Sequence, residues 1–495
     1  FDLHHSRHIV LWGKNPKVSN VHLVPVLQEA RERGAEILLI DPVHHKSVGL
    51  ADEVMMPRPG ADLELALGVA RALLDNGGIA ADVEHFCDGW SGYEALLMRH
   101  TVAEWAAMAG LKEAAVVGLA ERFASGPTAI QVGWGLQRRA RGGATVRALD
   151  ALCAVSDNLF VPGGGCSFYF ARRSFAAPAF RDGSDAPRTI REPLFGQDVL
   201  AASDPPIRAI WVTAGNPVVG LPDSAAVARA LEQTEFVVVA DSHWTDTARR
   251  ADLVLPVPTL LEDDDLLGSY GHHWLSESRP VVEPPPGVLH ELVLFQQLAQ
   301  RVGIGPKLEG SIDDWKRRLL ERVAPHGVTL ERLRAEGAVR NPLAGEQRFT
   351  ERRVPTPSGR VQLLGARDYV ELAGASSGYP LWLFSNSTEK SQASQWAGRG
   401  LGEHTWVVVH PDVATAAGLT AGDIVSVESE HGALSAELRV DPALREDLAV
   451  MPKGGGFDAG HCANQLIAAQ ATDLGLGASY LECRVRLRAL SVAGI

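Results

Sequence analysis

The chain has 495 residues, a formal net charge of −13 and a pI of about 5.7. This length predicts several domains, and the acidic balance, without a broad basic stripe, argues against a nucleic-acid scaffold. The sequence holds no run of about 20 apolar residues and no signal-like segment, so we expect no membrane span. It begins with Phe1 rather than Met, so part of the natural N-terminus is expected to be missing.

Cysteine and histidine spacing indicates no metal site within this chain. None of the five cysteines forms a C-x-x-C pair, which argues against a local thiolate cluster for zinc or iron–sulfur. Histidines occur as adjacent pairs rather than in an H-E-x-x-H motif. We therefore expect buried free thiols, and we assign no residue as a metal ligand or catalytic group.

The first half opens with a strand–helix–strand unit. Residues 9–12 form an apolar run closed by Gly13, residues 21–32 have a helical pattern, and residues 36–40 form a second apolar run. A unit of about 30 residues with this order implies a parallel sheet. The same reasoning predicts three further elements, namely a helix over 63–76, a strand over 129–133 and a helix over 142–155.

A second unit repeats this pattern about 200 residues later, with a strand over 209–213, a helix over 224–232 and a strand over 236–240. Asp41 and Asp241 follow the second strand of each unit, and each precedes an Ala-Asp pair by the same distance. Both units then run through a third strand to a proline. We interpret this spacing as an internal repeat.

The last third of the chain has a different pattern of predicted elements. Helices are predicted over 289–302 and 312–322, followed by an extended segment over 354–364. Short strands at regular spacing with turn signals between them are typical of a small β-barrel domain. Four such runs occur, at 406–409, 423–429, 434–440 and 448–451.

Two turns of the repeat end strands at the edge where a parallel sheet binds ligands. The first reads Gly-Lys-Asn-Pro at 13–16 and the second Ala-Gly-Asn-Pro at 214–217. Glycine lets backbone approach a ligand, asparagine offers a donor and an acceptor, and Asp41 or Asp241 can accept from a ribose hydroxyl or a guanine edge. An ordinary strand-to-helix turn also explains either motif alone, whereas the pair favours nucleotide binding. Neither is G-x-G-x-x-G, so a nicotinamide site is not supported.

Two further turns are candidates for the same ligand edge. Residues 58–62 read Arg-Pro-Gly-Ala-Asp, and Asp62 is expected either to cap the following helix or to face a ligand. Residues 133–137 read Gly-Trp-Gly-Leu-Gln and end another strand with glycines for close approach and an amide side chain.

The order of these motifs resembles that of the molybdopterin oxidoreductases of the dimethyl-sulfoxide-reductase superfamily. No single motif is decisive, but together they cover nearly the whole chain. Besides the four turns, the resemblance rests on Thr-Asp-Thr-Ala at 245–248, Ala-Asp-Leu-Val-Leu-Pro at 251–256, Thr-Pro-Ser-Gly-Arg-Val at 356–361, His-Pro-Asp-Val-Ala at 410–414, and Asn464.

The resemblance implies an α/β fold with two pseudo-symmetric, Rossmann-like parallel-sheet domains and a C-terminal six-stranded double-psi β-barrel. It places the first domain at 1–165, the second at 166–300, a connecting segment at 301–375 and the barrel at 376–495. It also implies two molybdopterin guanine dinucleotides (MGD), one in each α/β domain, that clamp one molybdenum or tungsten ion.

By position, the implied cofactor contacts form three sets. Those of the first domain are Gly13, Asn15, Pro16, Asp41, Pro59, Gly60, Asp62, Gly133, Gly135 and Gln137. Those of the second domain are Gly215, Asn216, Pro217, Asp241, Thr245, Thr247 and Asp252. Those of the barrel are Ser385, Lys390, Gln392 and Asn464, and Arg172 and Arg173 are candidates for steering an anionic substrate.

One departure from the family concerns the N-terminus. Family members usually begin with a cysteine-rich segment for a [4Fe–4S] cluster, and the protein ligand to the metal usually precedes the first Gly-x-Asn-Pro turn. Here that turn begins at Gly13. We therefore expect both the cluster and the metal ligand in a missing N-terminal segment.

The leading hypothesis is an oxidoreductase that moves an oxygen atom, or two electrons and a proton, on a small substrate. The resemblance implies an iron–sulfur or cytochrome electron-transfer subunit as partner. The implied location is the cytoplasm, or the periplasm if a twin-arginine signal precedes the chain. Two alternatives stay open, a non-catalytic structural homologue within an electron-transfer complex and a nucleotide-sugar or NAD enzyme.

Overall fold

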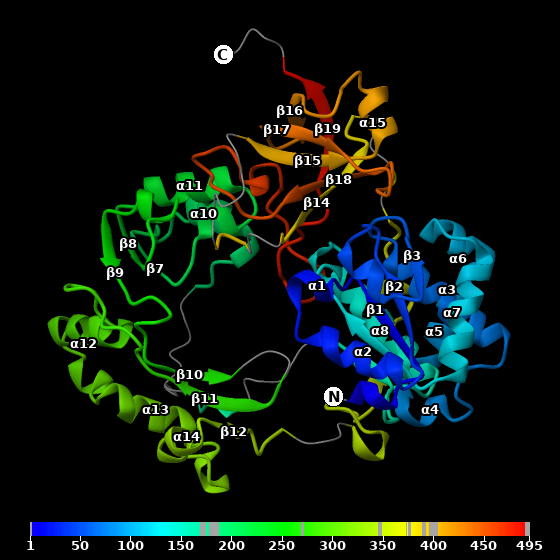
Figure 1. Cartoon of the computed structure of the whole chain (residues 1–495), viewed down its shortest axis with the longest axis horizontal. Coiled ribbons are helices and arrows are strands. Elements are labelled where there is room, and N and C mark those ends of the chain that lie inside the picture. The colour runs from blue at the N-terminus through cyan, green and yellow to red at the C-terminus, as the bar shows by residue number, and fades with distance from the viewer. Residues whose placement is uncertain are drawn as a thin grey trace.

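The computed structural model describes residues 2–168, 175–177, 188–268, 272–344, 349–372, 374, 378–388, 393–395 and 404–490. These residues form two parallel α/β sheets, a small antiparallel sheet and a closed barrel. Figure 1 shows the two α/β domains on opposite sides, with the barrel above and the antiparallel sheet below. The predicted fold class is confirmed.

The first sheet has five parallel strands in the order β3-β2-β1-β5-β6. Every residue of the central strand β1 is buried, because a parallel sheet carries helices on both faces. Helix α2 (Leu23–Glu32) packs on one face, and α3 (Asp62–Asp75) and α8 (Gly142–Val155) pack on the other. The strands are β1 (His8–Trp12), β2 (Glu36–Ile40), β3 (Glu53–Met55), β5 (Thr128–Val132) and β6 (Gly165–Ser167).

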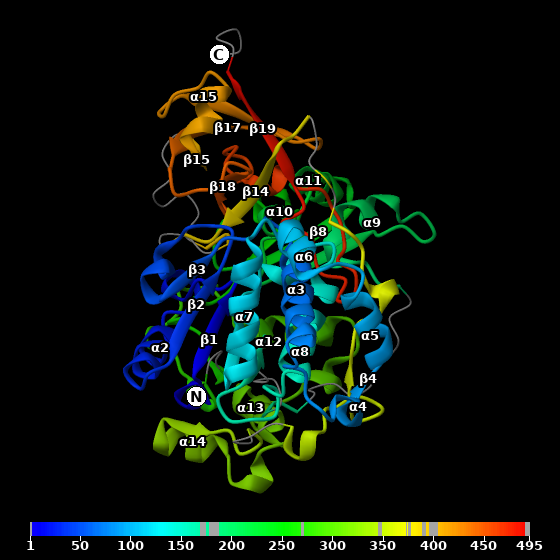
Figure 2. The same ribbon diagram turned by 90° about the vertical axis from the view of Figure 1, so that its right-hand side faces the viewer.

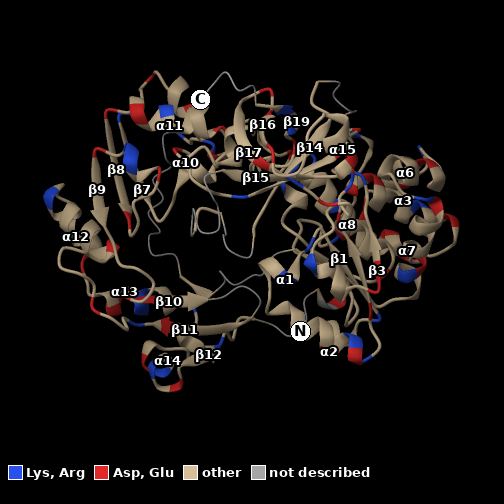
Figure 3. Ribbon diagram, turned by 45° about the horizontal axis from the view of Figure 1, so that its top comes forward, with Lys and Arg blue, Asp and Glu red and all other residues tan. Residues whose placement is uncertain are grey.

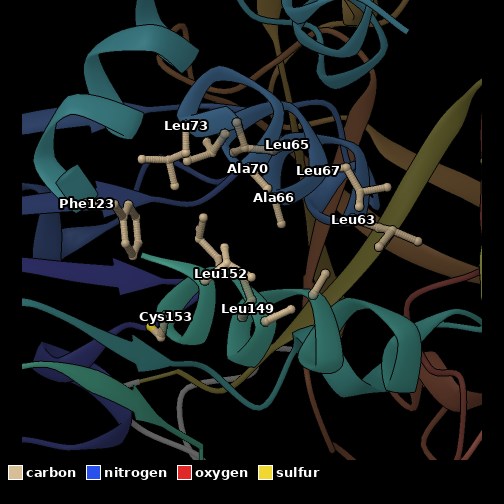
Figure 4. Packing of buried hydrophobic residues seen from close by; sticks show 14 of the residues in the cluster. Leu63, Leu65, Ala66, Leu67, Ala70, Leu73, Phe123, Leu149, Leu152 and Cys153 are labelled. Carbon is tan, nitrogen blue, oxygen red and sulfur yellow. The ribbon is translucent and has the colours of Figure 1, made fainter. Parts of the chain in front are cut away.

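Helix α3 is the centre of the larger core of this domain. It is buried almost all round because α6 (Val102–Ala109), α7 (Glu113–Ser125) and α8 surround it. Figure 4 shows Ala66 of α3 facing Leu149 and Leu152 of α8, with Phe123 of α7 at the side. The sequence predicted α3 and α8 but not α6, α7, α4 (Val83–Phe86) or α5 (Trp90–Leu97).

The second α/β sheet reproduces the first three strands of the first. Strands β7 (Ala209–Thr213), β8 (Phe236–Asp241) and β9 (Leu253–Pro256) pair in parallel, as β1, β2 and β3 do. Helix α11 (Ser224–Gln233) packs on this sheet as α2 does on the first. The described residues contain no counterpart of β5 or β6 in this sheet, so it is smaller and its strand ends are more exposed.

A three-stranded antiparallel sheet forms a separate unit that was not predicted. It consists of β10 (Asp265–Gly268), β11 (Trp274–Ser278) and β12 (Ala338–Arg340), and α13 (Ile312–Leu320) and α14 (Leu330–Glu336) cover it. Helix α12 (Glu291–Arg301) instead packs against the second domain through Phe295, whose ring lies 5.3 Å from that of Trp211.

The barrel closes in the order β14-β18-β15-β17-β16-β19. Alternate residues of its strands point inward, as in β16 and β17, and fill one apolar core. Four strands were predicted and two, β14 and β19, were not. The bounds are β14 (Leu381–Asn386), β15 (Thr405–Val409), β16 (Ile424–Glu428), β17 (Ala433–Val440), β18 (Leu448–Pro452) and β19 (Arg484–Ala489), with α15 (Pro411–Ala416) after β15.

The extended segment before the barrel belongs to the core of the first domain. Strand β13 (Val361–Gln362) pairs with β4 (Cys87–Asp88), and Leu363 and Leu364 join the same apolar cluster as α3. Figure 2 shows the barrel at the top of the molecule, with strands β1 to β3 and helices α3, α7 and α8 below it. The described residues include no helix long and apolar enough to cross a membrane.

Gly68 of α3 provides a test of this packing. A Cβ at Gly68 would lie 2.9 Å from Trp105 Cβ of α6, whereas a Cβ at Gly92 of α5 would meet nothing within 4 Å. We expect Gly68→Ala to lower the free energy of unfolding by about 1–3 kcal/mol through overpacking. Gly92→Ala is the control and should be neutral or stabilising by about 0.5–1 kcal/mol. Urea unfolding followed by circular dichroism compares them, and equal midpoints would contradict the tight α3–α6 contact.

Candidate cofactor site

A cavity of about 1290 Å³ lies where the carboxyl ends of β1, β2 and β5 meet the barrel. Pockets for ordinary small molecules span about 300–1,000 Å³, so this one has room for a larger ligand. Seven of the predicted cofactor contacts line it, namely Gly13, Asn15, Asp41, Asp62, Gly133, Gly135 and Ser385.

The other predicted contacts fall elsewhere. Asn464 Nδ2 donates to the carbonyl of Val219 at 2.8 Å, so this buried amide joins the barrel to α10 (Pro217–Gly220) of the second domain. Lys390, Gln392, Arg172 and Arg173 lie outside the described residues. The described contacts that do not line the cavity are Pro16, Pro59, Gly60, Gln137, Gly215, Asn216, Pro217, Asp241, Thr245, Thr247, Asp252 and Asn464.

A hydroxyl–amide clamp fixes each turn of the repeat. Ser47 Oγ donates to Asn15 Oδ1 at 2.7 Å, and Thr247 Oγ1 donates to Asn216 Oδ1 at 2.7 Å. In both halves the same hydroxyl accepts the backbone N–H two residues after the asparagine, at 3.1 Å and 3.2 Å. Because each amide oxygen is occupied, the amide nitrogen is the group left for a ligand.

The aspartates of the two repeat units have two different structural roles. Asp41 Oδ1 accepts the backbone N–H of Val43 at 2.9 Å, and Asp241 Oδ1 accepts that of His243 at 2.8 Å. Each carboxylate thus keeps its other oxygen for a further partner; in Asp41 this oxygen lies 3.3 Å from Nε2 of His45. Asp252, in contrast, accepts the backbone N–H of Val237 at 2.7 Å and holds the start of β8.

The glycines of these turns were expected to let the backbone approach a ligand, but the structure gives them other roles. Gly13 has φ +61°, and its equivalent in the repeat is Ala214 with φ +49°, so Gly215 occupies the place of Lys14. A Cβ at Gly133 would lie 1.5 Å from the carbonyl oxygen of Gly13. Gly133 is therefore required where the turns after β1 and β5 touch.

Asp62 does not cap α3, so the capping interpretation is wrong. The N-cap residue is Ala61, and Asp62 Oδ1 instead accepts the indole N–H of Trp12 at 2.9 Å. Trp12, the last residue of β1, thus holds the carboxylate of Asp62 at the wall of the cavity. Burial raises the pKa of Asp62, although the Trp12 bond and the nearby Arg139 charge act in the opposite direction.

Three cations line the same cavity and have no carboxylate partner among the described residues, namely Lys14, Arg138 and Lys453. Arg138 and Lys453 lie over the ring of Tyr480, at 5.4 Å and 5.6 Å from its centroid. Burial lowers the pKa of all three, and burial together with Arg138 lowers the pKa of Lys453 to about 8. Buried charges without a counter-ion are costly, so this arrangement indicates an anion site.

The sequence did not assign these cations to the cofactor. The only signal for Arg138 is the short basic cluster at 137–141, which fits one anion or a surface carboxylate equally well. Lys453 follows β18 at the start of a Lys-Gly-Gly-Gly run. They meet in the cavity because Arg138 belongs to the first domain and Lys453 to the barrel.

Arg139 fastens the barrel to the first domain beside this cluster. Arg139 is 5% exposed. Its guanidinium donates to the carbonyl of Leu481 and lies 5.1 Å from the ring centroids of both Trp382 and Phe384 of β14. Burial lowers the pKa of Arg139, and Glu482 and Asp62 partly compensate its charge. The seam between domain and barrel is thus rich in positive charge.

Family comparisons agree with this geometry. A family model described as molybdopterin oxidoreductase matches residues 1–301. The chain belongs to the molybdopterin oxidoreductase family. A second model, for the molybdopterin dinucleotide-binding domain of this family, matches residues 383–484, which contain the barrel strands from β15 to β18.

Relatives cover most of the chain. A probable oxidoreductase of Bacillus subtilis, YyaE, is 30% identical over 98% of this chain and 76% of its own length. The dimethyl sulfoxide/trimethylamine N-oxide reductase of Rhodobacter capsulatus is 26% identical over 91% of this chain, which spans 66% of that enzyme. Acetylene hydratase from Pelobacter acetylenicus has the same fold, with a TM-score of 0.80, 21% identity and coverage of 98% of this chain and 78% of that one.

The residues of the cavity fit a dinucleotide of this kind. Lys14, Arg138 and Lys453 bring positive charge to one cavity, which suits the phosphates of a dinucleotide. The amide nitrogen of Asn15 and the carboxylate of Asp41 lie on the same wall, where a base or ribose could be bound.

The cation cluster predicts a pH dependence of stability in the cofactor-free protein. Below about pH 8 both the folded and the unfolded chain hold the Lys453 proton, so the full cost of the buried charge is present. Between about 8 and the ordinary value of 10.5 the unfolded chain holds more protons, so the free energy of unfolding rises with pH. We expect a total rise of about 3 kcal/mol.

Lys453→Met should remove this rise. Lys112→Met, at the exposed N-cap of α7, is the control and should retain it. Urea unfolding across the same pH range measures the difference. An identical pH profile for the wild type and Lys453→Met would contradict a buried, uncompensated charge.

Proposed function

We propose that this chain binds two molybdopterin guanine dinucleotides around one molybdenum or tungsten ion, and that the loaded protein transfers an oxygen atom or two electrons on a small substrate. The single observation that carries the proposal is the set of three cavity cations without carboxylate partners in the described residues, beside a nucleotide turn that the chain builds twice. Membership of the molybdopterin oxidoreductase family supports it.

Each half has its own proposed contacts. For the first dinucleotide, Lys14, Arg138 and Lys453 would hold the pyrophosphate, and Asn15 and Asp41 would bind the guanosine. For the second dinucleotide, Asn216 and Asp241 have the same hydrogen-bonded setting as Asn15 and Asp41.

The metal–pterin group supplies the redox change when it is bound. The chain's own residues would bind it, orient it and exclude water from it. The relatives named as reductases of dimethyl sulfoxide, trimethylamine N-oxide and nitrate support a small oxo compound as the substrate class.

We do not assign an iron–sulfur cluster to the cysteines of this chain. Cys87, Cys153, Cys462 and Cys483 are buried free thiols, and Cys166 is half-buried. Burial raises the pKa of Cys87 and of Cys483 to about 12, which disfavours the thiolate that a cluster requires. An iron–sulfur or cytochrome subunit is the proposed electron-transfer partner.

Cofactor analysis tests the proposal. Protein purified from a host that makes MGD should contain one molybdenum or tungsten ion and release two GMP per chain on acid hydrolysis. Asn15→Ala and Asn216→Ala should each reduce the GMP content, because each removes an amide that faces one nucleotide. Asn76→Ala, at the exposed C-cap of α3, is the matched control and should keep both. Protein without metal and without GMP would overturn the proposal and favour the non-catalytic homologue.

A further inference from the structure

A short segment of strained backbone forms part of the cavity wall. Phe349 lines the cavity and lies just before the short helix η9 (Thr350–Arg352). Phe349, Glu351 and Arg352 have φ values of +58°, +60° and +54°. The left-handed region is unfavourable for side chains of these types, so the three residues raise the free energy of the 349–352 segment.

Arg352 holds this segment against the first domain. Its Nη1 donates to Oδ2 of Asp82 at 2.6 Å, and its Nη2 donates to both carboxylate oxygens of Asp157 at 2.7 Å. The guanidinium also lies over the ring of Phe86, 4.9 Å from its centroid. Asp82 precedes α4 and Asp157 follows α8, so one side chain joins two parts of the first domain to the segment before the barrel.

The contacts of Arg352 continue to the interior of the cavity. Phe86 meets Phe160 edge to face, with ring centroids 5.3 Å apart, and Phe160 lines the cavity as Phe349 does. A change at Arg352 therefore reaches the cavity wall by two routes, through the backbone to Phe349 and through these two rings.

The strain of the segment and the contacts that restrain it are of similar size. The side chains of Arg352, Asp82 and Asp157 are 36%, 57% and 41% exposed, and ion pairs of partly exposed groups are individually weak. Figure 3 shows acidic and basic residues interspersed over the outer helices of both domains, so an exposed ion pair is not distinctive in itself. The pairs of Arg352 differ because they oppose the strain of their own segment, which is therefore held in place by a small margin.

We propose that the 349–352 segment controls access to the cavity. While Arg352 is paired with Asp82 and Asp157, Phe349 stays in the cavity wall. When these pairs open, the strained residues return to ordinary backbone conformations and Phe349 leaves the wall. The open state admits a large ligand and the closed state retains it. This proposal concerns the cavity itself and does not depend on which ligand fills it.

Tryptic cleavage of the cofactor-free protein after Arg353 measures the opening of the segment. Arg353 is exposed and directly follows the segment. We expect Arg352→Gln and Asp157→Asn to speed this cleavage by about 5–30-fold, the factor that corresponds to the loss of one or two hydrogen bonds between charged groups. Asparagine tolerates the φ of +60° at position 157, so Asp157→Asn removes the charge and keeps the backbone.

Alkylation of Cys166 measures access to the cavity. Cys166 lines the cavity and is half-buried, whereas the other four cysteines are buried. The neighbouring Cys153 thiol, burial and Asp150 hold the pKa of Cys166 well above its usual value, and none of the substitutions changes these groups. Differences in the rate of labelling by a fluorescein maleimide, located by peptide mass spectrometry, therefore report access. This rate should rise together with the tryptic rate in Arg352→Gln and Asp157→Asn.

Glu351→Gly tests the strain itself. Because glycine adopts a positive φ at little cost, this substitution should slow both rates by about fivefold. Glu371→Gly is the matched control, since Glu371 is exposed and has no positive φ, and it should leave both rates unchanged. Arg360→Gln is the control for Arg352→Gln, since Arg360 pairs with Asp88 at 3.5 Å and has an ordinary φ.

Three results would overturn the proposal. They are equal rates in Arg352→Gln and the wild type, faster cleavage after Arg353 without faster labelling of Cys166, and rates in Glu351→Gly that are unchanged or higher. Unaltered circular dichroism checks that each variant folds. If Arg352→Gln does not fold, Asp157→Asn and Glu351→Gly decide by the same criteria.

Discussion

The repulsion between uncompensated cations at the seam of the first domain and the barrel governs the rest of the site. Arg138 and Lys453 approach the same Tyr480 ring from different domains, and Lys14 joins them from the first nucleotide turn. Such a cluster is unfavourable in an empty cavity and favourable around a phosphoanhydride. Because the docking of the barrel on the first domain brings these cations together, the folded chain favours an anionic ligand at this seam.

The repeated clamp explains how one chain can hold two similar ligands. In both halves a hydroxyl after the second strand fixes the asparagine after the first strand, so the turn has one shape wherever the unit occurs. Because the backbone and the clamp set this shape, the surrounding charges can differ without altering it. Lys14 and Gly215 illustrate this freedom at one equivalent position.

The sequence predicts those parts of the fold whose signals are local. The strands at 9–12, 36–40 and 236–240 are apolar runs inside two α/β units, and the structure confirms them as β1, β2 and β8. Strand β19 was missed because arginines alternate with its apolar residues; the charge of Arg486 is balanced 2.8 Å away by Glu428 of β16, which lies far off in the sequence.

The sequence predicted the site incompletely for the same reason, because several site residues depend on contacts that are distant in the sequence. Asp62 was expected either to cap a helix or to face a ligand; it lines the cavity, and its carboxylate accepts the indole N–H of Trp12 from a strand distant in the sequence. Gly133 was expected to approach a ligand, whereas the nearest constraint on it is the carbonyl of Gly13. Lys14, Arg138 and Lys453 could not be grouped from the sequence because only the docking of the barrel brings them to one cavity.

Native mass spectrometry of the protein purified from a molybdopterin-producing host tests the central claim most directly. The account predicts a folded species heavier than its polypeptide by two guanine dinucleotides and one molybdenum or tungsten ion. A folded species whose mass equals that of the polypeptide alone would contradict the account.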